Sequence, residues 1–481
     1  MSPASLAALR GRLLSHPRWR WMALMVVAGG MMLAVVNVSI VNIALPAMAV
    51  GLGVDVSAIS WVVTGFLVTQ ATLLALAGRA GDIYGRRRVF VAGVIVLCVA
   101  SILCALSWNA GSLITFRILQ AVGSCAMAPT AYSYAAELFA ARERGQALGI
   151  MGGVLGLAPV VALGLAGVLV AGFGWRSVFW ISPIVGVVVL AGAALLMVEI
   201  RHEERARTFD LAGALLAAVG LFGILLAVSR GEDWGWGSPV TAVSAAIGVV
   251  ALVLFALHER RAPDPMVDLE LAGARSARLA NMAGGISAAA LFGVLVALPF
   301  AFTALFGFGP VGLAFATMPI AAAYVLIAPL AGRVMGRVGS DRLAAGGFVL
   351  AAAGALWMGL AAAEQDYTVL LPGLCAFGVG MAMSTAAVST TAISEAPPHR
   401  LGVASAILNI ARYTGGALGT AVLGTILHAN LTGEVESGAG RADAAGRLLV
   451  ADGFRAAMIA AVAFLAVAAV CAARMPRLRT T

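Results

Sequence analysis

The stretch from Trp21 to Leu45, WMALMVVAGGMMLAVVNVSIVNIAL, contains no charged residue and is almost entirely apolar. A helix needs about 20 such residues to cross the hydrocarbon core of a bilayer. The stretch is too long for the apolar core of a signal peptide, and no obvious cleavage site follows it, so we expect it to remain as a membrane helix. This stretch decides the fold class, because similar long apolar runs recur along the rest of the chain.

The composition of the whole chain agrees with a membrane protein. Of its 481 residues, 62% are hydrophobic and 11% are charged, whereas a soluble domain carries about 25% charged residues. So few charges cannot cover a water-facing surface, but lipid covers the flank of a membrane protein. A soluble enzyme, a disordered chain and a disulfide scaffold are therefore disfavoured. No CxxC pair is present, which argues against a zinc site.

Apolar runs of spanning length recur along the chain, and we predict fourteen transmembrane helices in an all-α membrane protein. Their approximate ranges are 21–45, 57–77, 89–107, 111–136, 146–171, 178–199, 211–229, 239–257, 278–305, 311–331, 344–363, 369–393, 402–428 and 451–473.

The arginines predict how the chain is oriented. All 31 basic residues are arginine, and most of them lie at the termini or in loops on the same side of the predicted helices. Basic residues concentrate on the cytoplasmic side of membrane proteins. We therefore expect a multi-pass protein of the plasma (inner) membrane with both termini in the cytoplasm.

An internal duplication divides the predicted helices into two sets. Four short matches recur at nearly the same spacing: Ala44-Leu45-Pro46 with Ala297-Leu298-Pro299, Gly78-Arg79 and Gly85 with Gly332-Arg333 and Gly339, Val122-Gly123 with Val379-Gly380, and Gly145 with Gly402. We expect a six-helix bundle over residues 1–205, two inserted helices with a flanking loop over 206–262, and a second six-helix bundle over 263–481. Repeated bundles around a central cavity are typical of secondary transporters.

Three motifs carry a resemblance to a known family. They are Gly78-Arg79-Ala80-Gly81-Asp82-Ile83-Tyr84-Gly85-Arg86-Arg87-Arg88 after the second helix, Arg117-Ile118-Leu119-Gln120-Ala121-Val122-Gly123 in the fourth helix, and Asn37-Val38-Ser39-Ile40-Val41-Asn42-Ile43-Ala44-Leu45-Pro46 in the first. Together with fourteen spans they resemble the drug:proton antiporter branch of the major facilitator superfamily. The resemblance covers essentially the whole chain and does not specify a substrate.

The resemblance implies roles for particular residues. It implies a gating latch on the cytoplasmic side from Gly78, Asp82, Gly85, Arg86 and Arg87, with an ordinary positively charged loop as the alternative. It places a substrate or proton pathway at Asn37, Asn42, Arg117 and Gln120.

Two positions depart from the family pattern. The first position of the helix 1 motif is an aspartate in the family and is Asn37 here, and an amide cannot carry a proton as a carboxylate does. The helix 5 motif Gly-Pro-x-x-Gly-Gly survives only in Gly167 or, in another alignment, around Pro159. No acidic residue lies near the middle of a predicted span, so proton coupling through the usual carboxylate is in doubt, and Glu137 and His428 are weak alternatives.

Two arginines, Arg117 and Arg412, lie deep within predicted spans. Arg117 lies roughly 10 Å from the outer end of its helix and Asn37 roughly 12 Å from the outer end of its own, by the rise of 1.5 Å per residue. A charge at such depth is costly and commonly marks a transport pathway, although Arg117 could instead only bond carbonyl groups between helices.

Arg412, close to mid-depth beside Asn409, has two equally weighted interpretations, a substrate contact or a bond to neighbouring carbonyl groups. Tyr324 is a candidate lining residue of an apolar cavity. With two arginines and no acid, the cavity should favour neutral or anionic compounds.

The sequence therefore predicts a secondary transporter that exports small amphipathic drugs or metabolites by alternating access, linked to protons. The alternative within transport is a proton-independent facilitator, or an exporter of lipids or of neutral-to-anionic metabolites. A remote alternative is an integral-membrane transferase, although the chain shows no clustered acids or histidines. We expect no catalytic site, metal site, cofactor or nucleic-acid partner, and an ATP site of the GxxxxGK type is impossible without lysine.

Overall fold

The computed structural model describes residues 11–139, 151, 154, 158, 161–199, 210–262, 273–394, 401–428 and 444–476. This part of the chain is built of helices. Their bounds are α2 Trp19–Leu52, α3 Val56–Tyr84, α4 Arg86–Ala105, α5 Ala110–Leu138, η1 Trp175–Trp180, α7 Ile181–Leu196, α8 Leu211–Trp234, α9 Pro239–Glu259, α11 Arg275–Phe306, α12 Pro310–Val338, α13 Ser340–Ala361, η2 Ala362–Glu364, α14 Tyr367–Ser394, α15 Leu401–His428 and α17 Ala444–Ala473. A shorter apolar helix, Val161–Phe173, precedes η1.

As far as the described residues cover them, the predicted spans fall on these helices. Within the described residues, ten helices are long and apolar enough to cross a membrane. The spans predicted at 146–171, 211–229 and 311–331 are matched by the shorter apolar segments Val161–Phe173, Ala212–Val228 and Pro310–Ala323. The chain is thus an all-α, multi-pass membrane protein.

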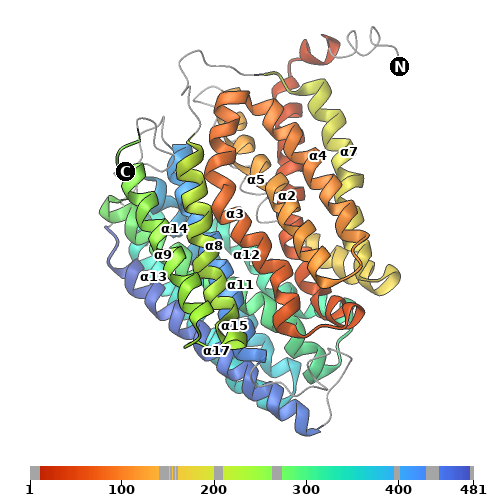
Figure 1. The fold of residues 1–481 in the computed structure, drawn as a ribbon, viewed down its shortest axis with the longest axis vertical. Coiled ribbons are helices and arrows are strands. Elements are labelled where there is room, and N and C mark those ends of the chain that lie inside the picture. The colour runs from red at the N-terminus through yellow and green to blue at the C-terminus, as the bar shows by residue number, and fades with distance from the viewer. Residues whose placement is uncertain are drawn as a thin grey trace.

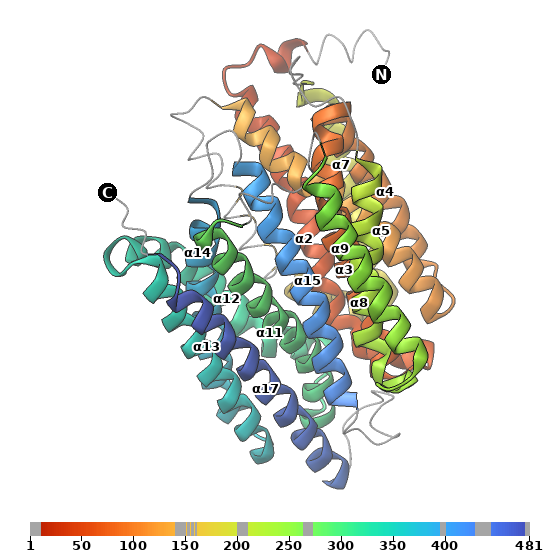
Figure 2. The same cartoon turned by 60° about the vertical axis from the view of Figure 1, so that its left-hand side comes forward.

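The helices run alternately up and down through one elongated bundle (Figures 1 and 2). We call the end at which α2 begins and α17 ends the terminal end, and the other the opposite end. Red-to-yellow helices α2 to α7 form one side of the bundle, and teal-to-blue helices α11 to α17 form the other. The two sides meet where α3 packs against α15 and where α2 packs against α11.

The two sides repeat the same backbone geometry. Gly53 follows the last residue of helix α2 and Gly307 follows that of α11, both in the left-handed conformation with φ of 63° and 66°. The next pair of helices is joined through Gly85 in one side and Gly339 in the other, with φ of 100° and 95°. These four turns need glycine because other residues rarely adopt positive φ. We refer to α2–α7 as the first half and α11–α17 as the second half.

Glycines also set the same close helix packing in both halves. A Cβ added at Gly123 of α5 would lie 2.5 Å from the Leu97 nitrogen of α4. A Cβ added at Gly380 of α14 would lie 2.5 Å from the Ala351 nitrogen of α13. Small residues let membrane helices approach in this way, so the two motif glycines have equivalent structural roles.

The inserted helices α8 and α9 form a hairpin of their own. Gly220 and Gly223 of α8 pack closely against Leu252 and Gly248 of α9. Helix α8 also contacts α3 and α15, so the hairpin lies along the junction of the two halves, where Figure 2 shows α8 and α9 beside α15. The domain boundaries at 205/206 and 262/263 themselves fall on or beside residues outside the described ranges and stay predictions.

Candidate functional site: a buried arginine between the helices of the first half

Arg117 of α5 is fully buried inside the first half. Its Nε donates to the backbone oxygen of Val62 in α3 at 3.2 Å, and its Nη1 donates to the backbone oxygen of Asn37 in α2 at 3.3 Å. Nη1 also donates to Oε1 of Gln120, one turn along α5. The guanidinium carbon lies 4.2 Å from the centre of the Phe66 ring. The side chain is therefore held from three helices.

Asn37 and Gln120 extend this network to two more helices. Gln120 Nε2 donates to Asn37 Oδ1 at 2.9 Å and to Ser101 Oγ of α4 at 2.5 Å. Ser182 Oγ of α7 donates to the same Asn37 oxygen at 3.0 Å, while Asn37 Nδ2 donates to the Leu33 oxygen at 2.8 Å. We call Asn37, Ser101, Arg117, Gln120 and Ser182 the Arg117 cluster.

The electrostatics of the Arg117 cluster are unusual for a buried cation. Every hydrogen-bond acceptor of the guanidinium in the described structure is a neutral oxygen, and Nη2 has no hydrogen-bond partner among the described residues. Burying a charge without an opposite charge nearby costs on the order of several kcal/mol, because the group loses its hydration. The face of Phe66 offsets part of this by a cation–π interaction of about 0.5–2 kcal/mol.

The structure thus brings together three of the residues that the sequence predicts for the pathway, Asn37, Arg117 and Gln120. Asn42, on the same helix as Asn37, is also buried, and its Oδ1 has no hydrogen-bond partner among the described residues. An unsatisfied buried amide oxygen is rare and indicates a place for a water or a ligand.

The remaining predicted pathway residues lie in the second half. Arg412 of α15 is partly exposed, and its Nη2 donates to Ser389 Oγ at 2.8 Å and to the Thr385 oxygen at 3.4 Å, both in α14. Asn409 precedes it by three residues on α15. The side chain of Tyr324 lies outside the described part of the structure. Arg412 therefore belongs to a different site from Arg117.

The loop predicted as a latch is a helix junction at the terminal end of the first half. Gly85 separates α3 from α4, and Arg86, Arg87 and Arg88 form the first turn of α4. Helix α3 contacts α5 here, since a Cβ added on Gly78 would lie 3.7 Å from Pro129 Cβ, an ordinary van der Waals distance. The side chain of Asp82 lies outside the described part, so its role in the latch stays a prediction.

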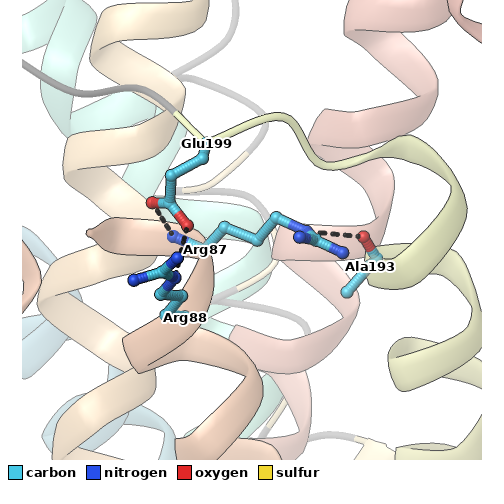
Figure 3. A network of polar contacts seen from close by, with 4 residues as sticks. All are labelled: Arg87, Arg88, Ala193 and Glu199. Carbon is cyan, nitrogen blue, oxygen red and sulfur yellow. Dashed lines mark hydrogen bonds and ion pairs between the residues drawn. The ribbon is translucent and has the colours of Figure 1, made fainter. Parts of the chain in front are cut away.

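An acid from another helix meets this turn (Figure 3). Glu199, just after α7, accepts a hydrogen bond from the backbone N–H of Arg87 at 3.2 Å, and its other oxygen lies 4.0 Å from Arg88 Nε. Arg87 Nε donates to the Ala193 oxygen of α7 at 3.4 Å. The N-terminus of α4 is the positive end of the helix dipole, which is destabilised by the three arginines and stabilised by a nearby carboxylate. Glu199 therefore stabilises the start of α4 and joins it to α7.

Gly167, the residue predicted from the helix 5 motif, lies at a close contact between the two halves. A Cβ at Gly167 would lie 2.8 Å from Ala314 Cβ and 3.1 Å from the Pro310 oxygen, both in α12. Gly167 therefore lets helix Val161–Phe173 of the first half touch the second half, near the opposite end. Pro159, the alternative alignment, lies outside the described residues.

Sequence reasoning missed Ser101, Ser182 and Glu199. Serines are common in membrane helices because their hydroxyl can donate to a carbonyl oxygen of the preceding turn, as Ser101 does to Leu97. Neither serine is therefore distinctive in the sequence. Glu199 is the last residue of the span predicted at 178–199, but its partner Arg87 is more than a hundred residues away and no spacing reveals that contact. These contacts depend on how the helices pack.

Comparisons with known proteins agree with this fold and with the helix motifs. The model of the Major Facilitator Superfamily matches residues 27–420. The puromycin resistance protein pur8 of Streptomyces alboniger is 33% identical, covering 88% of this chain and 84% of the relative. The tetracenomycin C resistance and export protein of Streptomyces glaucescens is 30% identical over 90% and 79%. The multidrug resistance protein Stp of Mycobacterium tuberculosis CDC 1551 is 31% identical over 85% and 76%.

A solved structure supports the fold independently. A bacterial homologue of the human lysosomal transporter Spinster, in an inward-facing and unoccupied conformation, has a TM-score of 0.68 and 16% identity, covering 96% of this chain and 98% of that one. At this identity the likeness concerns the fold alone. Since the family model spans most of the chain, this protein belongs to the Major Facilitator Superfamily and is a secondary membrane transporter.

Proposed function

We propose that the chain exports small amphipathic compounds, drugs or metabolites, across the plasma membrane by alternating access, with both termini in the cytoplasm. Relatives that carry the names of puromycin resistance, tetracenomycin C export and multidrug resistance support this substrate class. The concentration of arginines at the termini and in the loops of the same side supports the orientation.

The observation that carries the transport mechanism is the contact of the two halves near the opposite end. Gly167 meets Pro310, Val311 and Ala314 of α12, and Gly424 of α15 lies against Ser60 of α3, with 3.5 Å between its added Cβ and Ser60 Oγ. In the proposed orientation this is the external side. A transporter that rocks its halves must close one side by such contacts while the other opens.

We propose proton influx as the driving force. The Arg117 cluster contains no carboxylate to carry a proton. This favours a second candidate, in which transport does not depend on protons, or the protons travel by another route. Asn37 Oδ1 accepts hydrogen bonds from Gln120 and Ser182, and Asn37 Nδ2 donates to the Leu33 oxygen. Because an amide does not titrate, this arrangement is the same at every pH. In either case, proton binding at residue 37 is not part of the mechanism.

One efflux experiment tests both parts of the proposal. Cells that express the chain are loaded with fluorescent neutral, anionic and cationic amphipaths, and efflux is followed with and without a protonophore. Cells with a Gly167→Leu variant of equal expression serve as the control, because the larger side chain blocks external closure. We expect efflux only with the wild-type chain and its loss with the protonophore. Efflux that persists with the protonophore would establish the proton-independent candidate, and no efflux of any probe would contradict export.

A further inference from the structure

The second half reverses a charge contact that the first half makes at the terminal end. In the first half, Arg88 of α4 lies 4.0 Å from Glu199, which follows α7. Counting from the glycines that precede the two helices, Arg88 of α4 corresponds to Arg342 in the first turn of α13. Arg474 directly follows α17, which packs against α13 as α7 packs against α4. The second half therefore has two arginines where the first half has an arginine and an acid.

The two arginines of the second half lie at the same level of the bundle. Helices α13 and α17 pack side by side and run in opposite directions (Figure 2). They touch at Gly359, where an added Cβ would lie 3.0 Å from Met458 Cβ. From this contact Arg342 lies seventeen residues back along α13, and Arg474 lies sixteen residues on along the other chain segment. At 1.5 Å per residue, both are about 25 Å from the contact, toward the terminal end.

Neither arginine is neutralised by a partner within the described structure. Both side chains are exposed, and neither makes a hydrogen bond or an ion pair with a described residue. The side chain of Asp341, next to Arg342, is buried, so its carboxylate does not share the exposed surface. Two like charges at one level of neighbouring helices repel one another and attract an anion.

The two arginines border the surface that faces lipid. On α13, Arg342 lies seven residues before exposed Val349, and on α17, Arg474 follows exposed Val467 and Val470 at steps of four and three residues. Residues at these spacings share one face of a helix. Each arginine thus lies at the terminal end of an apolar, lipid-facing line of residues. Basic groups between transmembrane helices at the membrane surface bind the headgroups of anionic lipids.

Gly346 leaves a hollow next to Arg342 on this surface. It lies one turn along α13 on the same face. It is exposed, and an added Cβ would meet nothing within 4 Å. An acyl chain can therefore lie against α13 directly beside a headgroup that Arg342 holds.

We propose that Arg342 and Arg474 bind the phosphate of an anionic phospholipid in the leaflet at the terminal end, with an acyl chain in the hollow at Gly346. A guanidinium presents parallel N–H groups that match two oxygens of a phosphate. The lipid phosphate supplies the negative charge that Glu199 supplies in the first half. Because the arginines end lines of lipid-facing apolar residues, the structure favours a phospholipid over a free phosphate ion. This site is separate from the transport pathway and does not depend on the proposed export.

Lipid titrations of the purified, delipidated full-length chain in detergent test the proposal, with the melting temperature as the readout. The probes are dioctanoyl phosphatidylglycerol, dioctanoyl phosphatidylcholine and inorganic phosphate. The variants are Arg342→Gln, Arg474→Gln, the double variant and Gly346→Leu, which fills the hollow without changing a charge. Arg455→Gln is the matched control, because Arg455 is exposed on α17 near Gly359, where α13 has no arginine.

Phosphatidylglycerol should stabilise the wild-type chain and the control at the same concentration, and the other two probes should not. We expect the concentration for half of the effect to rise about threefold in each single arginine variant and at least tenfold in the double variant. Gly346→Leu should raise it severalfold. An unchanged double variant, or an equal loss in Arg455→Gln, would overturn the site. Equal stabilisation by inorganic phosphate would overturn the phospholipid as its ligand.

A charge reversal provides a second test. Arg474→Glu gives the second half the arginine and acid of the first half. We expect this variant to melt no lower than the wild-type chain in lipid-free detergent and to gain no stability from phosphatidylglycerol. Full stabilisation of Arg474→Glu by this lipid would contradict the proposal.

Discussion

The two halves pack their helices alike but fill equivalent positions with different chemistry. Counting from the paired glycines Gly123 and Gly380, Arg117 corresponds to Leu374 and Gln120 to Phe377. Counting from the paired glycines Gly85 and Gly339, Ser101 corresponds to Ala355. All three residues of the second half are apolar and fully buried.

This difference separates what the fold needs from what function needs. The second half shows that an apolar core at these positions supports the same helix packing. The polar core of the first half is therefore not required by the architecture, and buried ionic groups are commonly less stabilising than apolar ones. We infer that the Arg117 cluster persists because transport uses it.

The first turns of α4 and α13, at the terminal end, show a second and smaller difference between the halves. In the second half, α13 carries its own acid in the first turn, Asp341. In the first half the corresponding position is Arg87, and Glu199 supplies the carboxylate from beyond α7. The same electrostatic need is thus met within one helix in the second half and between two helices in the first.

The largest expected effect comes from giving the second half the charge of the first. Leu374→Arg would bury a guanidinium where Phe377 and Ala355 offer no hydrogen bonds. We expect a destabilisation of about 3–5 kcal/mol and almost no folded protein by size-exclusion chromatography of detergent extracts. Leu374→Met, the control, should fold normally. A well-folded Leu374→Arg would show that the second half tolerates the charge and would weaken the comparison.

Removing the central acceptor of the Arg117 cluster should cost less. Gln120→Ala removes the charge-assisted bond to Arg117 and the bonds to Asn37 and Ser101. A loss of about 1.5–3 kcal/mol follows from the value of hydrogen bonds to charged groups. We expect a lower melting temperature of the purified protein together with loss of efflux. The control is Gln365→Ala, far from the cluster, which should leave efflux intact.

The paired glycines should respond alike. Gly123→Ala and Gly380→Ala each place a Cβ 2.5 Å from a backbone nitrogen of the neighbouring helix. Each should lose about 1–3 kcal/mol by overpacking, seen as similar drops in melting temperature. Gly164→Ala, where an added Cβ meets nothing within 4 Å, is the control. A tolerated change in one half alone would mean that the packing is not equivalent.

Glu199 should have the smallest effect. Glu199→Ala removes an acceptor at the start of α4 and an ion pair with an exposed arginine, worth about 0.5–1 kcal/mol together. Glu199→Gln keeps the acceptor for the Arg87 N–H and should retain most of the stability. Thermal melting in low and high salt distinguishes the two, and equal losses in both variants would show that the ion pair dominates.

The sequence alone predicts the helices and the pairing of Asn37 with Arg117 at similar depth. The length of the apolar runs predicts the helices, and the positions of the motifs predict the pairing. The sequence does not predict that Ser101 and Ser182 complete the Arg117 cluster, because those contacts depend on the rotation of α4 and α7. Nor could it distinguish Arg117, enclosed within one half, from Arg412, partly exposed beside the junction, since both are single arginines in apolar spans.

One measurement tests the central inference directly. A triple variant, Arg117→Leu, Gln120→Phe and Ser101→Ala, gives the first half the core of the second. The melting temperature of the purified protein and the efflux of a transported probe are measured together. The account predicts a folded protein of at least near wild-type stability that has lost efflux. A folded variant that exports the probe at the wild-type rate would contradict it.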